Sequence, residues 1–219
     1  MKTLLIIGAS KGIGRKAIDY ALELGCNVRA MARSAEKIEL EHDRLEKFSG
    51  DATDPNDVRR ALDGVDAVIL ALGVPSGPTR LLQPVTLFSR STEILVDAME
   101  ASGPKRLIVV TGFGAGESRS AMNRVEEFGH HMLLGRAYAD KDVQEKIIER
   151  SSLNWTIARP TILTNGRATG KYKILTDPES WRNGLISRSD VAGFLVDRAL
   201  DRENLHEAPV LVTTCSPVS

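Results

Sequence analysis

Apolar and polar residues alternate along the chain in blocks that predict a repeated order of strand and helix. Short apolar runs of strand length are followed by longer stretches in which apolar residues recur at helical spacing. The pattern predicts strands at Thr3–Ile7, Val28–Ala32, Leu45–Phe48, Ala67–Leu72, Arg106–Thr111, Trp155–Arg159 and Val210–Thr213. It predicts helices at Ile13–Leu24, Asn56–Leu62, Val85–Ala101, Ala121–Leu134, Ala137–Arg150 and Asp190–Leu200. This alternation indicates an α/β protein with a Rossmann-type, doubly wound parallel sheet in three layers.

No repeat, low-complexity tract or Pro/Gly-rich linker interrupts the alternation, so we expect a single domain over residues 1–219. One segment, Asn165–Ile186, departs from the pattern. We expect it to form loops and a short β-ribbon over the C-terminal edge of the sheet, where open α/β folds bind ligands. The expected substrate-side loop regions therefore lie around residues 113–135 and 165–186.

Charge and cysteine content narrow the class of protein. The chain has 29 Lys and Arg and 29 Asp and Glu, so its formal net charge of zero gives no support for a nucleic-acid or membrane-surface partner. No apolar run approaches the roughly 20 residues of a membrane span. Cys26 and Cys215 lie far apart without a Cys/His cluster. We therefore expect no disulfide and no metal site, a cytoplasmic location, and a monomer or weak homodimer.

The most informative motif follows the first predicted strand and reads Gly8-Ala9-Ser10-Lys11-Gly12-Ile13-Gly14. An apolar strand, a glycine-rich turn and a helix together build a dinucleotide site. One glycine permits the tight turn, one lets the backbone approach a pyrophosphate, and one lets the helix pack close to the strand. The helix N-terminus then offers free N–H groups to the phosphates.

Residues after the second and third predicted strands indicate the type of dinucleotide. An NAD-type site has an acidic residue where this chain has Arg33, and an arginine there favours a 2′-phosphate. Lys11 adds a second positive charge on the same side, so the sequence predicts NADP(H). The alternative is that Arg33 is simply a solvated residue at the end of the strand. Asp51 and Ala52 are candidates for the adenine amino group and ring face. The alternative for Asp51 is a helix N-cap, a role that Thr53 or Asp54 can fill equally well.

Several short motifs recur in the order in which they stand in a known family. They are Gly8-Ala9-Ser10, Ala32-Arg33-Ser34, Gly50-Asp51-Ala52, Asp66-Ala67-Val68-Ile69, Leu72-Gly73, Trp155-Thr156-Ile157-Ala158-Arg159-Pro160, Thr169-Gly170-Lys171-Tyr172 and Ile186-Ser187-Arg188-Ser189-Asp190-Val191-Ala192. With the G-x-x-x-G-x-G spacing, they make nearly the whole chain resemble the atypical short-chain dehydrogenase/reductases with an NAD(P)H-binding, or NmrA-like, domain. The chain is most similar to the biliverdin IX-beta reductase/flavin reductase branch.

The resemblance implies cofactor contacts at matching positions. It implies that the pyrophosphate is held by Gly8, Ser10, Gly12, Ile13 and Gly14, and the 2′-phosphate by Arg33. Leu72 and Gly73 would lie along the adenosine, and Thr111 and Gly112 beneath the nicotinamide ribose. Pro160–Leu163, including Ile162, would lie beside the nicotinamide amide. Ser187 and Asp190 would cap the last helix.

The catalytic pattern of the superfamily is only partly present. Typical members use Tyr-x-x-x-Lys and a serine after the fifth strand. Here Tyr138 and Lys141 are three residues apart, and Thr111 stands one residue before the serine position. Lys141 is a candidate for contact with the cofactor ribose, and Tyr138 is a candidate for proton donation. The alternative for Tyr138 is a partly buried packing residue with its hydroxyl at the surface. His130 and His131 are candidates for another proton source, and the alternative is that they are surface residues.

These observations lead to a function that needs no protein acid. An easily reduced acceptor takes its proton from water, while hydride chemistry belongs to the cofactor. We therefore expect an NADPH-dependent reductase of a flavin, quinone or similar conjugated acceptor; the alternative is a non-catalytic NADP(H)-binding redox-sensing regulator. A sugar-nucleotide epimerase is disfavoured. Phe113, in the glycine-rich loop Gly112–Arg119, is either a stacking wall for substrate or part of a flexible connector. Trp181 and Met122 either line the same cleft or belong to the core.

Overall fold

The computed structural model describes residues 1–73, 86–121, 124–201 and 203–213, and gives only the course of the helix for 124–136. Its centre is an eight-stranded sheet in the order β3-β2-β1-β4-β5-β6-β10-β8. The strands are β1 (Thr3–Ile7), β2 (Asn27–Ala32), β3 (Leu45–Ser49), β4 (Ala67–Leu70), β5 (Arg106–Val110), β6 (Asn154–Pro160), β8 (Tyr172–Leu175) and β10 (Val210–Thr213). Neighbouring strands are parallel except for β8, which pairs antiparallel with β10. The Rossmann-type sheet predicted from the sequence is thus confirmed.

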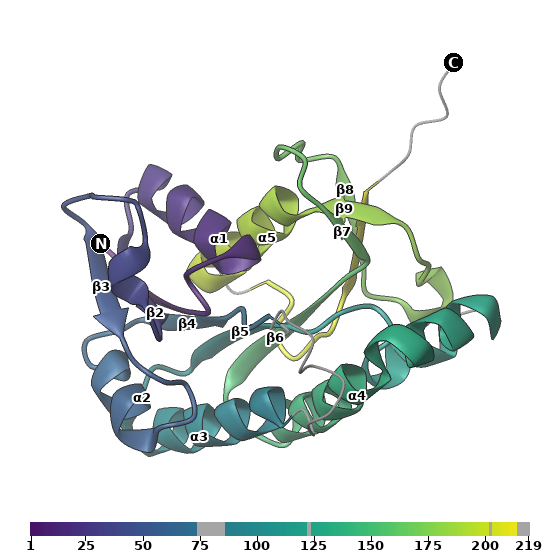
Figure 1. Ribbon diagram of the computed structural model, residues 1–219, viewed down its shortest axis with the longest axis horizontal. Helices are drawn as coiled ribbons and strands as arrows, with labels where there is room; N and C mark the ends of the chain where they lie inside the picture. The colour runs from purple at the N-terminus through teal and green to yellow at the C-terminus, as the bar shows by residue number, and fades with distance from the viewer. Residues whose placement is uncertain (74–85, 122–123, 202, 214–219) are drawn as a thin grey trace.

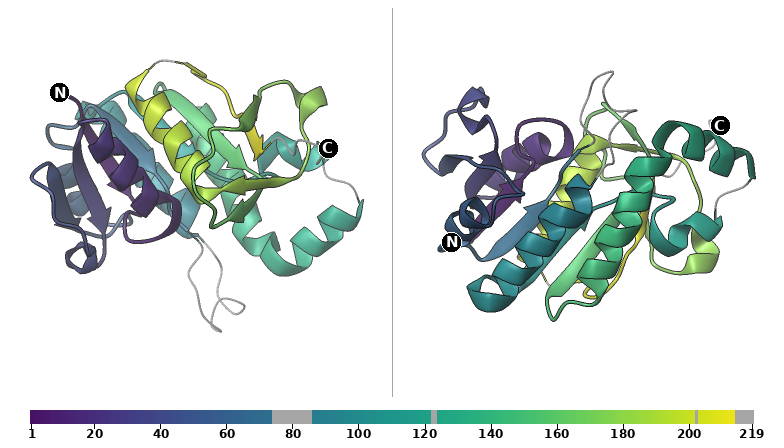
Figure 2. Two further views of the ribbon diagram at one scale, coloured as in Figure 1. Left: turned by 90° about the horizontal axis from the view of Figure 1, so that it is seen from above. Right: turned by 60° about the horizontal axis from the view of Figure 1, so that its bottom comes forward.

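Helices cover both faces of this sheet (Figure 1). The first face carries α1 (Gly12–Glu23) and α5 (Arg188–Leu200), which lie side by side when seen from above (Figure 2, left). The second face carries α2 (Pro55–Leu62), α3 (Leu87–Ser102) and α4 (Arg124–Glu149). In β1, Leu4 and Ile6 pack toward the first face and Leu5 and Ile7 toward the second, because successive side chains of a strand point to opposite sides. The central strands are therefore buried on both faces, as their nearly continuous apolar runs require.

The segment after β6 crosses the C-terminal edge of the sheet. A second, two-stranded parallel sheet forms from β7 (Ile162–Thr164) and β9 (Leu185–Ser187). The prediction that the strands of Asn165–Ile186 pair with each other as a ribbon is therefore wrong. Its strand at Tyr172–Leu175 extends the main sheet by pairing with β10, and its end at Leu185 pairs with β7.

Two predicted helices are one in the structure. The chain runs as the continuous helix α4 through Gly135, where the sequence predicted a break after Leu134. A glycine inside a helix costs about 1 kcal/mol relative to alanine, and packing of α4 along α3 offsets a penalty of this size (Figure 2, right). Ala121 ends a separate 3₁₀ helix at Gly116–Ala121. Within the described ranges, no helix combines the length and apolar character that a membrane crossing needs.

Candidate active site

The glycine-rich turn between β1 and α1 brings three chain segments into close contact. Gly8 has a φ of +87°, and a Cβ on it would stand 2.5 Å from the carbonyl oxygen of Ala71, just after β4. A Cβ on Gly14 would overlap the carbonyl oxygen of Gly8. These two glycines therefore let α1 approach β1, and β1 approach the end of β4.

Gly12 differs from both, because the space beside it is open. Its φ is +61°, and no described atom lies within 4 Å of a Cβ built on it. Lys11, the N-cap of α1, makes no side-chain hydrogen bond to the first turn. Ser10 and Lys11 are exposed, while Ile13 packs into the core. An open glycine beside an uncapped helix N-terminus fits a pyrophosphate, which needs backbone N–H donors and room for close approach.

Arg33 and Asp51 follow the adjacent strands β2 and β3 at the same edge of the sheet. Arg33 is exposed, and Ala52 is buried beside the half-buried Asp51. Hydrogen bonds from the N–H and hydroxyl of Thr53 lower the pKa of Asp51, and the charge of Arg33 lowers it further. Asp54, not Asp51, caps α2 by accepting hydrogen bonds from two backbone N–H groups. The alternative role of Asp51 as a helix cap is thus excluded.

The remaining predicted cofactor residues stand near the C-terminal ends of β4 and β6. Leu72 is half-buried and Gly73 is exposed, and both lie within three residues of the end of β4 at Leu70. Pro160 is the last residue of β6, and its carbonyl oxygen accepts a hydrogen bond from the N–H of Phe113. Ile162 begins β7 with 57% of its surface exposed, which is unusual for isoleucine and places an apolar side chain at this edge.

Lys141 is buried at the end of β5. Its ammonium donates a hydrogen bond to the carbonyl oxygen of Thr111 and lies 5.0 Å from the ring centre of Phe88 and 5.6 Å from that of Tyr138. Burial lowers the pKa of Lys141 to about 8, against the opposing effect of nearby Glu145. The same burial, together with Glu145, raises the pKa of Tyr138 to about 12. The i,i+3 spacing therefore does bring the tyrosine and the lysine together, but it does not give the tyrosine a lowered pKa.

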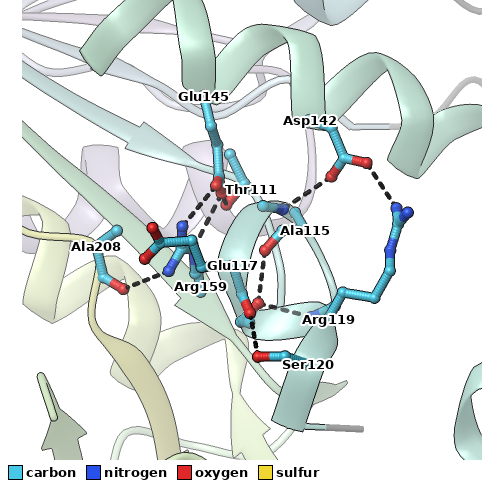
Figure 3. A network of polar contacts seen from close by, with 12 residues as sticks. Thr111, Ala115, Glu117, Arg119, Ser120, Asp142, Glu145, Arg159 and Ala208 are labelled. Carbon is cyan, nitrogen blue, oxygen red and sulfur yellow. Dashed lines mark hydrogen bonds and ion pairs between the residues drawn. The ribbon is translucent and has the colours of Figure 1, made fainter. Parts of the chain in front are cut away.

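The side chain of Thr111 joins a buried ion pair that the sequence did not reveal (Figure 3). Its hydroxyl donates to Glu145 Oε1 over 2.6 Å. Arg159 Nη2 donates to Glu145 Oε2 over 2.7 Å, and Arg159 Nε donates to Glu145 Oε1 over 3.1 Å. The side chains of Glu145 and Arg159 are each only 1% exposed. Arg159 stood in the sequence as the single charge in an apolar strand, and a buried charge of that kind requires a partner.

The loop Gly112–Arg119 is fixed to α4 and to the edge of the sheet. Asp142 accepts a hydrogen bond from the N–H of Gly116 over 2.8 Å and pairs with Arg119 over 2.6 Å (Figure 3). Phe113 is 5% exposed and packs with Leu175, Val210 and Val212. The expectation that Phe113 forms a stacking wall for substrate is therefore wrong, because Phe113 is a core residue.

The remaining predicted residues either cap or pack against other elements, or lie outside the residues that the structure describes. Ser187 caps α5 as expected, by accepting a hydrogen bond from the N–H of Asp190. The side chain of Asp190 does not cap the helix; its carboxylate accepts hydrogen bonds from the N–H groups of Thr169 and Gly170. Trp181 is half-buried, with its ring 5.3 Å from the Arg159 guanidinium. Met122 and the side chains of His130 and His131 lie outside the described residues. No group of three or more metal-ligating side chains occurs in the part of the chain that the structure describes.

Comparison with known proteins shows the family to which the chain belongs. The family described as NAD(P)H-binding matches residues 8–202. The uncharacterized sugar epimerase YhfK of Bacillus subtilis is 29% identical over 204 residues, covering 92% of this chain and 89% of that protein. ChuY, an anaerobilin reductase from Escherichia coli O157:H7, has the same fold, with a TM-score of 0.80 at 24% identity and 100% coverage of both chains. A short-chain dehydrogenase/reductase from Veillonella parvula in complex with NADP has a TM-score of 0.81 at 18% identity, over 99% of this chain and 95% of that one. The chain therefore belongs to the NAD(P)H-binding family and is an atypical short-chain dehydrogenase/reductase, an oxidoreductase whose cofactor is NAD(P)H.

Proposed function

We propose that this protein transfers hydride from NADPH to a flavin, a quinone or a similar conjugated acceptor that takes its proton from solvent. The observation that carries the choice of acceptor is the state of Thr111. A buried carboxylate paired with arginine is ionised and can only accept hydrogen bonds, so the Thr111 hydroxyl must give its one proton to Glu145. Thr111 is then left with acceptor lone pairs alone and has no proton to give to a substrate.

The other two candidate acids support the same choice. A phenol with a pKa of about 12 is a weaker acid than free tyrosine, and Tyr138 has this value because it is buried near Glu145. Lys141 uses its ammonium to hold the carbonyl oxygen of Thr111. An aldehyde or ketone needs a proton as hydride arrives, which these groups are poorly placed to deliver. A conjugated acceptor spreads the added charge and can be protonated by water.

The cofactor would lie across the C-terminal edge of the sheet. The backbone of Gly8, Ser10, Gly12, Ile13 and Gly14 would hold the pyrophosphate, with the first turn of α1 as the source of N–H donors. Leu72 and Gly73 would flank the adenosine, and Asp51 and Ala52 the adenine. Thr111, Gly112 and Lys141 would hold the nicotinamide ribose, and Pro160 and Ile162 the nicotinamide. Bound there, NADPH would supply the hydride, and the protein would orient the two reactants.

The preference for NADPH over NADH rests on Arg33 and Lys11. Both are exposed, one after β2 and one at the N-cap of α1, and β2 lies next to β1 in the sheet. A guanidinium and an ammonium at this corner favour a dianionic 2′-phosphate. Asp51 follows the adjacent strand β3, and its carboxylate would repel that phosphate, a repulsion that the positive charge of Arg33 would offset.

The test is NADPH oxidation with FMN, FAD and simple quinones as acceptors, followed at several protein concentrations. Proportional rates with at least one acceptor would support the reductase function. Tight NADPH binding without turnover on any of the acceptors would contradict it and favour a redox-sensing regulator. A simple aldehyde or ketone panel run in parallel should give no turnover.

A further inference from the structure

Glu145 has a place in the site that neither the sequence pattern nor the dinucleotide motif explains. It stands on α4, one turn beyond Lys141, and its carboxylate reaches the end of β5 below the glycine-rich loop. One oxygen accepts the Thr111 hydroxyl and Arg159 Nε, and the other accepts Arg159 Nη2 (Figure 3). Arg159 is fixed in turn by a hydrogen bond from its Nη1 to the carbonyl oxygen of Ala208 over 3.2 Å.

Stability alone does not account for this pair. Two fully buried charges lose their hydration, and apolar residues of similar volume often stabilise a protein as well or better. The pair also lies at the C-terminal edge of the sheet, because Arg159 is the next-to-last residue of β6 and Glu145 bonds to Thr111, which follows β5. What the charge does achieve is to fix the direction of one hydrogen bond, because a carboxylate can accept but cannot donate.

The same carboxylate also limits the glycine-rich loop. Gly116 has a φ of +54°, and a Cβ on it would overlap Glu145 Oε2 and stand 2.8 Å from Arg159 Nη2. The backbone of the loop therefore rests directly on the ion pair. The Glu145 carboxylate thus accepts the hydroxyl of Thr111 and lies against the backbone of Gly116.

We propose that Glu145, held by Arg159, is a positioning residue of the reductase site, which makes Thr111 meet the bound dinucleotide as a hydrogen-bond acceptor only. The proposal rests on the proposed function, because it concerns the residue beneath the nicotinamide ribose. A ribose hydroxyl is a donor that can use such an acceptor. If Glu145 were neutral, the Thr111 hydroxyl could turn and donate to either partner, and the ribose would lose a preoriented contact.

The test measures NADPH affinity without turnover, by fluorescence titration of folded variants. Glu145→Gln and Thr111→Val should each weaken NADPH binding by about fivefold to tenfold, the effect of one hydrogen bond. The double variant should bind about as weakly as either single variant, because both changes remove the same contact. Thr111→Ser, which keeps a hydroxyl, should lose less affinity than Thr111→Val.

Asp142→Asn is the matched control. It makes the same acid-to-amide change on the same helix and loosens the same loop, but its side chain bonds to Gly116 and Arg119 and not to Thr111. Its NADPH affinity should stay within about twofold of the wild-type value, less than the loss of one hydrogen bond gives. Circular-dichroism melting of every variant separates loss of folding from loss of positioning.

The proposal is overturned if Glu145→Gln is folded and binds NADPH within about twofold of wild type, or if the two single effects multiply in the double variant. Should Glu145→Gln fail to fold, Glu145→Asp replaces it, because the shorter side chain keeps the charge beside Arg159 but withdraws it from Thr111. Glu145→Asp should also weaken NADPH binding by about fivefold to tenfold, and binding within about twofold of wild type would overturn the proposal. Failure of the reductase function would look different. Wild-type protein would then bind NADPH and reduce no acceptor, while the dependence of binding on Glu145 would remain.

Discussion

The phenol oxygen of Tyr138 lies against the backbone of Gly112, so close that a Cβ on Gly112 would stand 2.5 Å from it. Typical members of the superfamily have their catalytic serine at this position. The missing serine and the shifted tyrosine are therefore parts of one packing arrangement, because the tyrosine that stands one residue late on its helix fills the space of the absent side chain.

This contact predicts coupling between the two positions. Gly112→Ala should lower the free energy of unfolding by about 1–3 kcal/mol, the range for overpacking. In a Tyr138→Phe background the loss should be smaller by about 1 kcal/mol, because the clashing oxygen is gone and the next ring atom, Cζ, is 3.2 Å from the added carbon. Urea unfolding of the four proteins of this cycle measures the coupling. Strictly additive losses would show that the contact carries no energy.

Gly12→Val should abolish NADPH binding in a protein that still folds. The added side chain meets no described atom within 4 Å, so it occupies the space assigned to the pyrophosphate. Its φ of +61° adds backbone strain. Gly64→Val is the control, since Gly64 has a φ of +67°, equally open surroundings and a position before β4 at the opposite edge of the sheet. Calorimetric titration should find binding lost in the first variant and kept in the second; binding kept in both would place the phosphates elsewhere.

Arg33→Ala should weaken NADPH binding by about 1.5–3 kcal/mol, the scale of a hydrogen bond to a charged group, and leave NADH binding nearly unchanged. The loss is selective because only NADPH carries the 2′-phosphate. Arg150→Ala, which removes an exposed arginine after the end of α4, controls for the change in net charge. Titration with both nucleotides checks the prediction. An equal loss for NADPH and NADH would remove Arg33 from the phosphate site.

Lys141 should make stability depend on pH in the alkaline range. Its pKa is about 8 in the folded protein against 10.5 for a free lysine, so the unfolded chain binds more protons between these values. Stability then rises with pH across this window, and the penalty for burying the ammonium is fully present below pH 8. Lys141→Met lacks this titration. The free energy of unfolding of wild type minus that of Lys141→Met should rise by up to about 3 kcal/mol from pH 7 to 10; a flat difference would mean that the amine is not buried as a cation.

The sequence predicted the sheet well because local patterns determine it. Each central strand is a short apolar run. The glycine spacing of the turn at Gly8 and Gly14 predicted the close approach of α1 to β1 that the structure shows. Predictions failed where distant residues decide the outcome. Gly135 reads as a break until α3 is known to pack along α4. The strand Tyr172–Leu175 pairs with β10, about 40 residues later, and not with a strand of its own segment.

Chemistry was harder to predict than topology for the same reason. The Tyr138–Lys141 pair was visible because both residues lie on one helix turn. Glu145 was not, because a glutamate in a charged helix reads as a solvated residue until the end of β5 and Arg159 of β6 are brought to it. Phe113 looked like a wall of an open cleft only because its partners Val210 and Val212 lie nearly 100 residues away.

The kcat of Tyr138→Phe tests most directly whether the protein positions its reactants and supplies no acid. The measurement is steady-state reduction of a flavin or quinone acceptor by saturating NADPH. We predict a kcat within about threefold of wild type, because the phenol, with a pKa of about 12, has no proton-transfer role to lose. A fall of about a hundredfold or more, the range of general acid catalysis, would contradict the account and restore the tyrosine mechanism.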